Sequence, residues 1–235
     1  MEKSKKVYEI FQNISPYYDK ANNRISLGLQ KKWKKKLVED IGKEISAKDK
    51  VLDICCGTGD IAIAIAEESE ANVCGLDFSE NMLNQARKKS KSIKNVSFAK
   101  ADAKDLPYPD SVFACVSISF GLRNTDDYEK VIGEMARVAR GKIYVMDSFP
   151  VENILIKPFY TLFFKYLMPL LGGGIKRYKE YTWLYESTKN FVSPKQLVKI
   201  YEKLGLENIE VRKMLFGACV IIKGQKSQHT GEIYE

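Results

Sequence analysis

The fold follows from one stretch of sequence, Lys50-Val-Leu-Asp53-Ile-Cys-Cys-Gly57-Thr58-Gly59-Asp60. Its apolar run, 50–54, is bounded by charge on one side and by glycines on the other, which predicts a short buried strand. Glycines at a strand-to-helix turn let the backbone approach a ligand closely, and the helix that follows presents unpaired N–H groups. We therefore expect a ligand site at the carboxyl end of this strand.

The chain on either side alternates strand and helix patterns. We expect further strands at 72–77, 96–101, 112–119 and 143–146, and helices at 61–68, 79–91 and 126–139. Ser79 has a side chain suited to cap the second of these helices. A helix opening at Ser193-Pro194 and a closing strand pair, 206–211 and 216–222, complete the pattern. Such alternation predicts an α/β fold with a mainly parallel sheet covered on both faces.

Length and composition are those of a soluble globular protein. The 235 residues suit one domain, and hydrophobic and charged residues make up 45% and 29% of them. Nothing at the start resembles a signal peptide, and the five cysteines show no paired spacing, so we expect reduced thiols in a cytoplasmic protein. Because the one histidine, His229, lies in a polar tail, we expect no metal site.

The positive charge is concentrated near the N-terminus. Net charge is +8, and residues 1–50 carry 13 Lys/Arg against 7 Asp/Glu, much of the excess in Lys31-Lys32-Trp33-Lys34-Lys35-Lys36. Such a run can meet an anionic membrane surface or nucleic acid. The same run is also typical of the solvated face of an ordinary helix, so the sequence allows either a binding surface or a solvated helix face.

Residues 154–171 are apolar and aromatic but contain two lysines and two prolines, so we do not expect a membrane span. The segment predicts either a lid over an apolar groove or a helix that packs on the core. We accordingly divide the single domain into an arm that covers the substrate (1–45), a cofactor-binding core (46–150), a lid insertion (151–192), a closing helix and strand pair (193–224) and a flexible tail (225–235).

The glycines alone do not identify the cofactor, since Gly57-x-Gly59-x-x-Ala62 also fits a dinucleotide fingerprint. The carboxylates nearby favour S-adenosylmethionine. Asp53 precedes the glycines, where it would repel a pyrophosphate but attract an amino group. Asp77, 18 residues past Gly59, can hold ribose hydroxyls at the end of its strand. Asp102 ends the third strand and could accept from an adenine amine, although Asp60 and Asp102 could equally cap a helix or a turn.

Several longer motifs resemble the ubiquinone/menaquinone biosynthesis C-methyltransferases, the UbiE/MenG family. The most specific are Tyr18-Asp19-x-x-Asn22 near the start and Ser119-Phe120-Gly121-Leu122-Arg123-Asn124 after the fourth strand. Further agreements include Trp33, Leu106-Pro107-Tyr108-Pro109-Asp110 and the stretch from Asp77 to Leu83. Two positions depart from the family pattern: Arg140-Gly141-Lys142 replaces a Pro-Gly-Gly turn, and Ile222 stands where a histidine is common.

The resemblance implies the Rossmann-like fold of class I methyltransferases, with a mainly parallel seven-stranded sheet, helices on both faces and an antiparallel last strand. It implies S-adenosyl-L-methionine as cofactor and methyl transfer to a ring carbon of a polyprenyl quinol. With the glycine-loop residues, the expected cofactor-binding positions are Asp53, Gly57, Thr58, Gly59, Asp77, Asp102, Ala103 and Ser119.

A ring carbon becomes nucleophilic when a neighbouring hydroxyl ionises. Without a core histidine, we expect Arg123 and Asn124 to serve the reaction, Arg123 by stabilising a phenolate or ordering a water. Tyr18 and Asp19 would close over the ring. The alternative for Arg123 is an ordinary salt bridge to Asp126 or Asp127.

Expected partners are the polyprenyl quinol and, through the basic arm and the aromatic lid, the inner face of the membrane. We expect no nucleic acid, and a homodimer stays open. Two other classes compete with this reading. A methyltransferase acting on RNA or on another small molecule shares the fold, but Ser119-Phe120-Gly121-Leu122 replaces the Asn/Asp-Pro-Pro-Tyr/Phe element of amino-methylating nucleic-acid enzymes. A nicotinamide-dependent oxidoreductase shares the glycines, but Asp53 and Asp102 argue against it.

Overall fold

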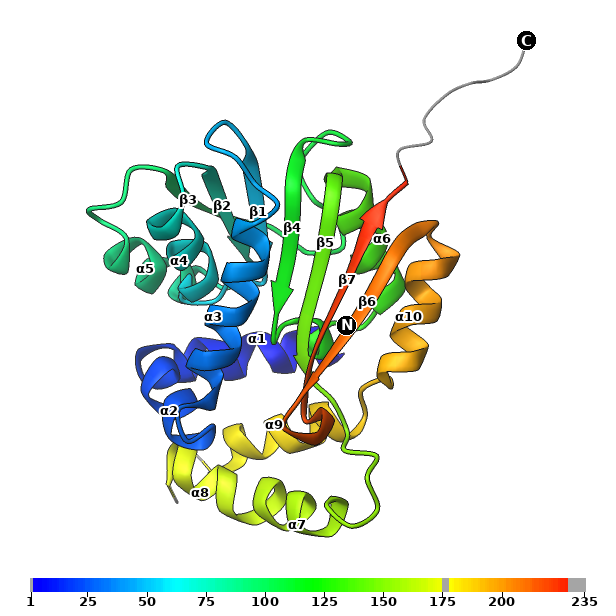
Figure 1. Cartoon of the computed structure of the whole chain (residues 1–235). Coiled ribbons are helices and arrows are strands. Elements are labelled where there is room, and N and C mark those ends of the chain that lie inside the picture. Colours follow the sequence, from blue (N-terminus) through cyan, green and yellow to red (C-terminus); the bar gives the residue numbers. More distant parts are fainter. Residues whose placement is uncertain (1, 175–177, 228–235) are drawn as a thin grey trace.

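In a computed structural model, which describes residues 2–174 and 178–227, the chain forms one seven-stranded sheet of order β3-β2-β1-β4-β5-β7-β6 (Figure 1). The strands are β1 (Lys50–Ile54), β2 (Asn72–Asp77), β3 (Val96–Lys100), β4 (Phe113–Ser119), β5 (Ala139–Ser148), β6 (Leu206–Met214) and β7 (Cys219–Lys226). The pairs β3-β2, β2-β1, β1-β4 and β4-β5 are parallel. The last strand, β7, runs antiparallel to both of its neighbours, as expected.

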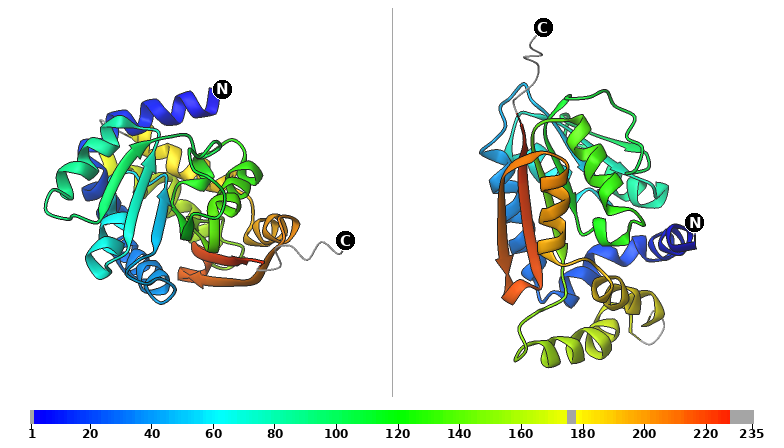
Figure 2. Two further views of the ribbon diagram at one scale, coloured as in Figure 1. Left: turned by 90° about the horizontal axis from the view of Figure 1, so that it is seen from above. Right: turned by 90° about the vertical axis from the view of Figure 1, so that its right-hand side faces the viewer.

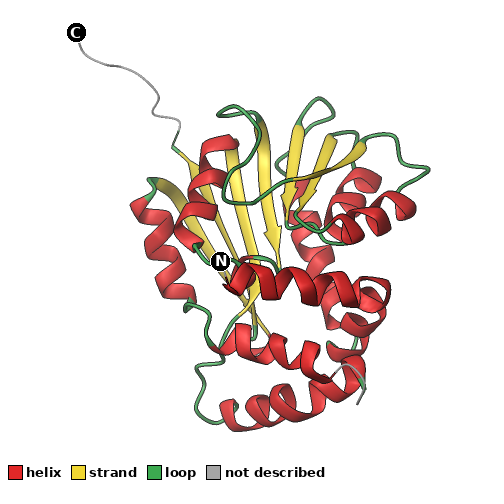
Figure 3. Ribbon diagram, turned by 180° about the vertical axis from the view of Figure 1, so that it is seen from behind, coloured by secondary structure: helices red, strands yellow, loops and turns green. Residues whose placement is uncertain are grey.

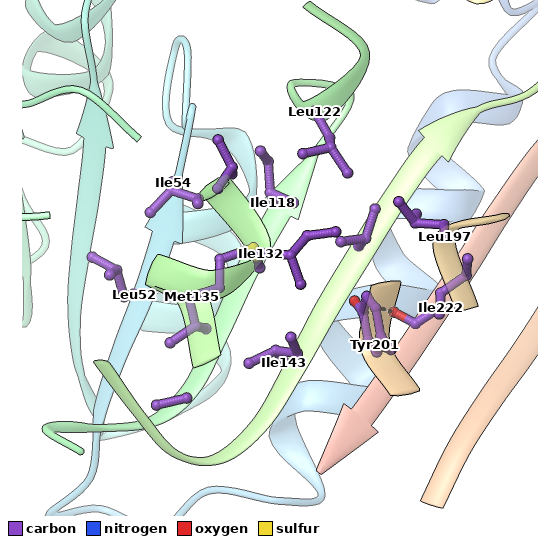
Figure 4. Packing of buried hydrophobic residues seen from close by; sticks show 14 of the residues in the cluster. Leu52, Ile54, Ile118, Leu122, Ile132, Met135, Ile143, Leu197, Tyr201 and Ile222 are labelled. Carbon is purple, nitrogen blue, oxygen red and sulfur yellow. Dashed lines mark hydrogen bonds between the residues drawn. The ribbon is translucent and has the colours of Figure 1, made fainter. Parts of the chain in front are cut away.

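Helices cover both faces of the sheet (Figure 2). On one face lie α3 (Leu29–Gly42) and α4 (Asp60–Glu68), and on the other lie α6 (Tyr128–Val138) and α10 (Pro194–Lys203). The helix α5 (Glu80–Lys89) follows β2 and contacts β3. Figure 4 shows how Ile132 and Met135 of α6 pack on sheet residues such as Leu52 and Ile118. These side chains are 0% exposed, so the hydrophobic effect fixes the helix against the sheet.

The remaining helices gather at the carboxyl ends of the parallel strands. They are α1 (Glu2–Ile14), η1 (Ser15–Tyr17) and α2 (Tyr18–Ile25) of the arm, and α7 (Lys157–Leu162), the π-helical turn η3 (Phe163–Leu167), α8 (Met168–Gly173) and α9 (Tyr178–Lys189) of the lid. Figures 1 and 3 show both groups below the sheet, with α7 farthest from it. In parallel α/β sheets this edge is where ligands bind. Among the described residues, no helix is long and apolar enough to cross a membrane.

The elements differ from the expected ones mainly at their ends. The fifth strand runs over Ala139–Ser148 instead of 143–146, because it pairs along its length with both β4 and β7. The last strand starts at Cys219 rather than 216, since residues Leu215–Gly217 form a 3-10 turn, and it continues to Lys226. Two residues of the expected tail, Gln225 and Lys226, are therefore strand residues, while 228–235 lie outside the described residues. The lid segment 154–171 contains three short helical pieces, two of which have a proline as their second residue.

Candidate active site

The glycine loop is built around Asp77 at the end of β2. Its two carboxylate oxygens accept hydrogen bonds from the backbone N–H groups of Gly57 and Ser79, each at 2.8 Å. Gly57 has φ +56° and Gly59, at the N-terminus of α4, has φ +81°, a region that disfavours other residues. The loop thus turns tightly over the strand and leaves Asp77 at the floor of a cavity.

That cavity, here the cofactor cavity, lies across the ends of β1, β2 and β4. Five of the predicted cofactor-binding residues line it: Gly57, Asp77, Asp102, Ala103 and Ser119. The arm closes it from the other side with Val7, Phe11 and Tyr18. The Ser119 hydroxyl is buried and makes no hydrogen bond to the described part of the chain, so it is available to a ligand. Asp102 lines the cavity and also caps a turn, accepting from the Lys104 backbone N–H at 2.9 Å.

A smaller pocket, here the side pocket, adjoins the cofactor cavity through Gly57 and Ser119. It is lined by predicted residues Asp53 and Thr58 and by Lys34 of α3, the one basic side chain among its described lining residues. Asp53 is 1% exposed and accepts a hydrogen bond from Ser117 at 2.8 Å. A carboxyl, a hydroxyl and an ammonium in one small space match the amino and carboxylate groups of an amino acid.

Ion pairs join the arm to the glycine loop. Asp60 pairs with Lys34 at 2.8 Å and with Lys89, and although burial opposes ionisation, the two lysines hold its pKa well below the usual value. Asp19 of the arm accepts from Thr58 at 2.7 Å and pairs with Lys89 at 3.0 Å. Asp60 is therefore part of this charged cluster. Asp19 binds the loop and does not line the cavities around the site.

Burial raises the pKa values of the two carboxyls beneath the loop. The pKa of Asp77 rises to about 6 despite its backbone hydrogen bonds, and that of Asp53 rises to about 7 despite the bond from Ser117. Desolvation disfavours the charged form of each group. A ligand that brings positive charge would restore ionisation, and this electrostatic setting fits a sulfonium and an amino group better than a phosphate.

A second cavity, here the apolar cavity, lies between the arm and the lid. It has a volume of about 300 Å³ and shares Tyr18 and Phe120 with the cofactor cavity, so the two spaces meet at these rings. Apolar side chains dominate its lining: Ile25, Leu27, Leu29, Trp33, Ile156, Phe163, Phe164, Leu184, Leu215 and Phe216. A predominantly apolar pocket with few polar groups is typical of small-molecule sites.

The motif Ser119 to Asn124 forms the turn between these cavities. Phe120 has φ +56°, and its carbonyl accepts from Arg123 Nη1 at 2.8 Å and from Asn124 Nδ2 at 3.3 Å. Gly121 is required because a Cβ would lie 2.5 Å from the Cβ of Cys55. Asn124 also accepts from Trp183 of α9 at 3.0 Å. The turn is thus fixed by its own side chains, and Asn124 fastens it to the lid.

Arg123 lies at 4% exposure in the wall of the apolar cavity, paired with Asp147 at the end of β5. Asp147 is fully buried and also accepts from the Arg123 backbone N–H at 3.1 Å. The alternative prediction, a salt bridge from Arg123 to Asp126 or Asp127, was wrong about the partner. Asp126 pairs with Lys104, and Asp127 caps α6 by accepting from the Lys130 backbone N–H.

Comparison with known proteins identifies the family. The model of the ubiE/COQ5 methyltransferase family matches residues 1–226. The chain belongs to this family. It is 39% identical to the demethylmenaquinone methyltransferase of Bacillus cereus (strain ATCC 10987 / NRS 248), over 96% of this chain and 98% of that protein. The enzyme of the same description from Bacillus anthracis (strain CDC 684 / NRRL 3495) has the same identity and coverage.

Solved structures confirm the predicted methyltransferase fold. A possible histamine N-methyltransferase from Thermotoga maritima has a TM-score of 0.65 at 20% identity, covering 94% of this chain and all of that one. Magnesium protoporphyrin IX methyltransferase from Synechocystis, solved with bound S-adenosylhomocysteine, has a TM-score of 0.63 at 17% identity, covering 87% and 86%. The chain is a methyltransferase that uses S-adenosylmethionine, and the oxidoreductase alternative is excluded.

The cavities and the Arg123 ion pair include residues that were not predicted from the sequence as site residues. They are Lys34 in the side pocket, Asp147 behind Arg123, and Asn22 and Tyr160 in the lining of the apolar cavity. Asn22 belongs to the Tyr-Asp-x-x-Asn motif, which was a signal for its position there. The other three have no local pattern that marks them. Across the described residues, no group of three or more His, Cys, Asp or Glu side chains could hold a metal ion.

Proposed function

We propose that this methyltransferase methylates a ring carbon of a polyprenyl quinol, of the demethylmenaquinol to menaquinol type. The observation that carries the proposal is the junction at Tyr18 and Phe120, where the cofactor cavity meets an apolar cavity whose wall contains a buried arginine. A flat ring with an isoprenoid tail suits such a space. The curated relatives, named as demethylmenaquinone methyltransferases, support the same acceptor.

The cofactor would be held by Asp77 at its ribose, by Asp102 and Ala103 near its adenine, and by Ser119, Thr58 and Asp53 near its amino-acid part. When bound, it supplies an electrophilic methyl group on a sulfonium. Its amino group would favour the ionised form of the buried Asp53 carboxyl, whereas the Asp77 carboxylate would accept hydrogen bonds from the ribose hydroxyls. The arm residues Val7, Phe11 and Tyr18 exclude water from the reacting groups.

Arg123 would act on the acceptor. It keeps its charge near neutral pH, and in the low dielectric of the cavity it stabilises the negative charge that develops when a ring hydroxyl ionises. Electron density then moves to the adjacent carbon. A bond from this carbon to the methyl group would form across the junction as the methyl–sulfur bond breaks and S-adenosylhomocysteine leaves, and the protons of the hydroxyl and of the ring carbon would be released to solvent. Asn124 positions the turn through Trp183, and Asp19 holds the arm closed through Thr58.

We further propose that the protein works as a cytoplasmic enzyme in peripheral contact with a membrane. Large apolar side chains of the lid are exposed, among them Phe159 at 76% and Leu162 at 62%. Leu27 and Phe216, exposed at 73% and 70%, line the apolar cavity itself. Exposed lysines flank them at positions 31, 32, 157, 165 and 213. An apolar surface with basic residues suits an anionic lipid interface, from which a quinol tail could enter.

The direct test is methyl transfer by the purified enzyme to reduced demethylmenaquinone under anaerobic conditions, followed by mass spectrometry. We expect one methyl group to be added to the quinone ring. A deletion strain that accumulates demethylated quinone would support the same assignment, provided that the wild-type gene restores the methylated quinone and a gene encoding Arg123→Ala does not. Normal quinones in the deletion strain would refute it and favour another small-molecule acceptor.

A further inference from the structure

Three buried polar side-chain atoms of residues that line the apolar cavity make no hydrogen bond of good geometry to the described part of the chain. They are Nδ2 of Asn22, whose side chain lies beside the Tyr18 phenol, Nε of Arg123 and the phenol oxygen of Tyr160. They come from three separate elements, α2, η2 (Leu122–Asn124) and α7. The cavity therefore collects unpartnered hydrogen-bonding groups from the arm, the core and the lid at once.

Buried polar groups without partners are rare in proteins because each costs free energy that a hydrogen bond would recover. Other polar groups of the same cavity do have partners: the Ser26 hydroxyl donates to the Asn22 carbonyl oxygen at 2.7 Å. Three exceptions around one space of ligand size indicate that a ligand supplies the missing bonds. Since the rest of the lining is largely apolar, that ligand has few polar atoms, and they are separated by an apolar body.

The position of Arg123 orients such a ligand. Its guanidinium bonds the Phe120 carbonyl at 2.8 Å, and Phe120 lies at the junction with the cofactor cavity. If the reacting carbon of the ring faces the junction, the hydroxyl on the neighbouring carbon therefore lies against Arg123. In a quinol, the second hydroxyl lies para to the first, on the opposite edge of the ring. The cavity lining includes Asn22 of the arm and Tyr160 of the lid, which could meet this second hydroxyl.

We propose that Tyr160 and Asn22 bind the second hydroxyl of the acceptor ring and so select a 1,4-quinol over a ring with a single hydroxyl. The inference rests on the proposed function, because it assumes an aromatic acceptor in the apolar cavity. The burial of Tyr160 supports it: desolvation raises the pKa of this phenol, although Arg123 nearby opposes the rise, so the phenol stays neutral and can donate. A site built to bond a hydroxyl discriminates strongly against an analogue that lacks it.

The test uses two acceptors, a geranyl-substituted 1,4-naphthoquinol and the naphthol in which the hydroxyl next to the geranyl-bearing carbon is replaced by hydrogen. Inhibition constants or KM values are measured for both, under reducing conditions, with wild-type enzyme, Tyr160→Phe and Asn22→Leu. We expect each variant to weaken binding of the naphthoquinol about 10-fold, the loss of one neutral hydrogen bond, and to leave the naphthol unchanged. KM should change more than kcat, because neither group touches the reacting carbon.

Tyr166→Phe is the matched control, since Tyr166 is on the same lid but 53% exposed, and it should behave as wild type. Affinity for S-adenosylhomocysteine verifies that each variant is folded. Equal weakening of both acceptors, or none, would overturn the role of Tyr160 and Asn22 while leaving the proposed function intact. Wild-type enzyme that binds neither acceptor would instead refute the proposed function, and the inference with it.

Discussion

Replacing Asp147 with asparagine would remove the charge that neutralises Arg123 in the core while keeping the side chain's shape. The Asp147 carboxylate has no exposed surface and accepts from Arg123 Nη1, from the Arg123 backbone N–H and from the Ser148 backbone N–H at 2.7 Å. Asparagine has one acceptor oxygen, so one of these donors would face an NH₂ group. The guanidinium would also remain buried without a counter-ion.

The expected loss is large for a single substitution. Removing one partner of a buried ion pair costs about 3–5 kcal/mol, because it leaves an uncompensated buried charge. For a chain of this length, each kcal/mol corresponds to about 2–4 °C in melting temperature, so Asp147→Asn should lower the Tm by roughly 6–20 °C. Activity on the quinol should also fall, since Arg123 loses the group that fixes its orientation.

Thermal and urea unfolding followed by circular dichroism would measure the effect. Glu129→Gln is the control, because Glu129 pairs with Lys203 at the surface, with side chains 47% and 66% exposed, and should cost less than about 1 kcal/mol. The double variant Arg123→Met/Asp147→Asn removes both charges and should be more stable than Asp147→Asn alone. Two results would refute the reasoning. One is a free energy of unfolding for Asp147→Asn within about 1 kcal/mol of wild type. The other is a double variant whose loss of stability equals the sum of the losses in Asp147→Asn and Arg123→Met measured singly.

Three further predictions concern the cofactor, and one concerns the membrane. Asp77→Ala should weaken S-adenosylhomocysteine binding by about 1.5–3 kcal/mol in calorimetry, and unchanged affinity would show that the ribose is held elsewhere. Lys34→Met should weaken binding of S-adenosylhomocysteine but not of methylthioadenosine, which lacks the amino-acid part. Lys35→Met, at the exposed neighbouring position, is the control. Equal losses of affinity for both ligands would contradict the assignment. Burial raises the pKa values of Asp77 and Asp53 to about 6 and about 7, so the stability that their protonated forms lend the free protein is complete below about pH 4 and is lost as pH rises through these values. Cofactor affinity should increase over the same pH range, and Asp53→Asn should abolish the increase near pH 7. An affinity that does not change with pH would contradict charge pairing. Co-sedimentation with anionic vesicles should be stronger at low than at high salt, with about 1 kcal/mol from each lysine near the surface, and equal partition at both salts would disprove the electrostatic contribution.

The sequence predicted the part of the molecule that local patterns encode. The run 50–60 has both the apolar periodicity of a buried strand and the glycines of a tight turn, so strand, loop and helix follow directly. Ser79 caps α5 as expected, accepting from the Met82 backbone N–H, because capping depends on a residue and its near neighbours. That residues at the strand ends would line one cavity was predictable because the carboxyl ends of parallel strands share one edge.

What could not be predicted depends on contacts between distant segments. Asp147 meets Arg123 only because β4 and β5 are neighbours in the sheet, and no spacing rule connects the two positions. The nearer acids at 126 and 127 were therefore the wrong partners to expect. Lys34 looked like one member of a basic run, and only the packing of α3 against α4 brings it to Asp60. Tyr160 becomes a polar group in an apolar wall only after the lid has folded over the arm.

The arm forms part of the wall of both cavities, and this links the two ligands thermodynamically. Tyr18 lines the cofactor cavity and the apolar cavity alike, and Asp19 beside it is fastened to Thr58 and Lys89. A ligand that rigidifies this helix lowers the entropic cost that the second ligand has to meet. Binding should therefore be cooperative and reciprocal: the factor by which S-adenosylhomocysteine tightens the quinol must equal the factor by which the quinol tightens S-adenosylhomocysteine.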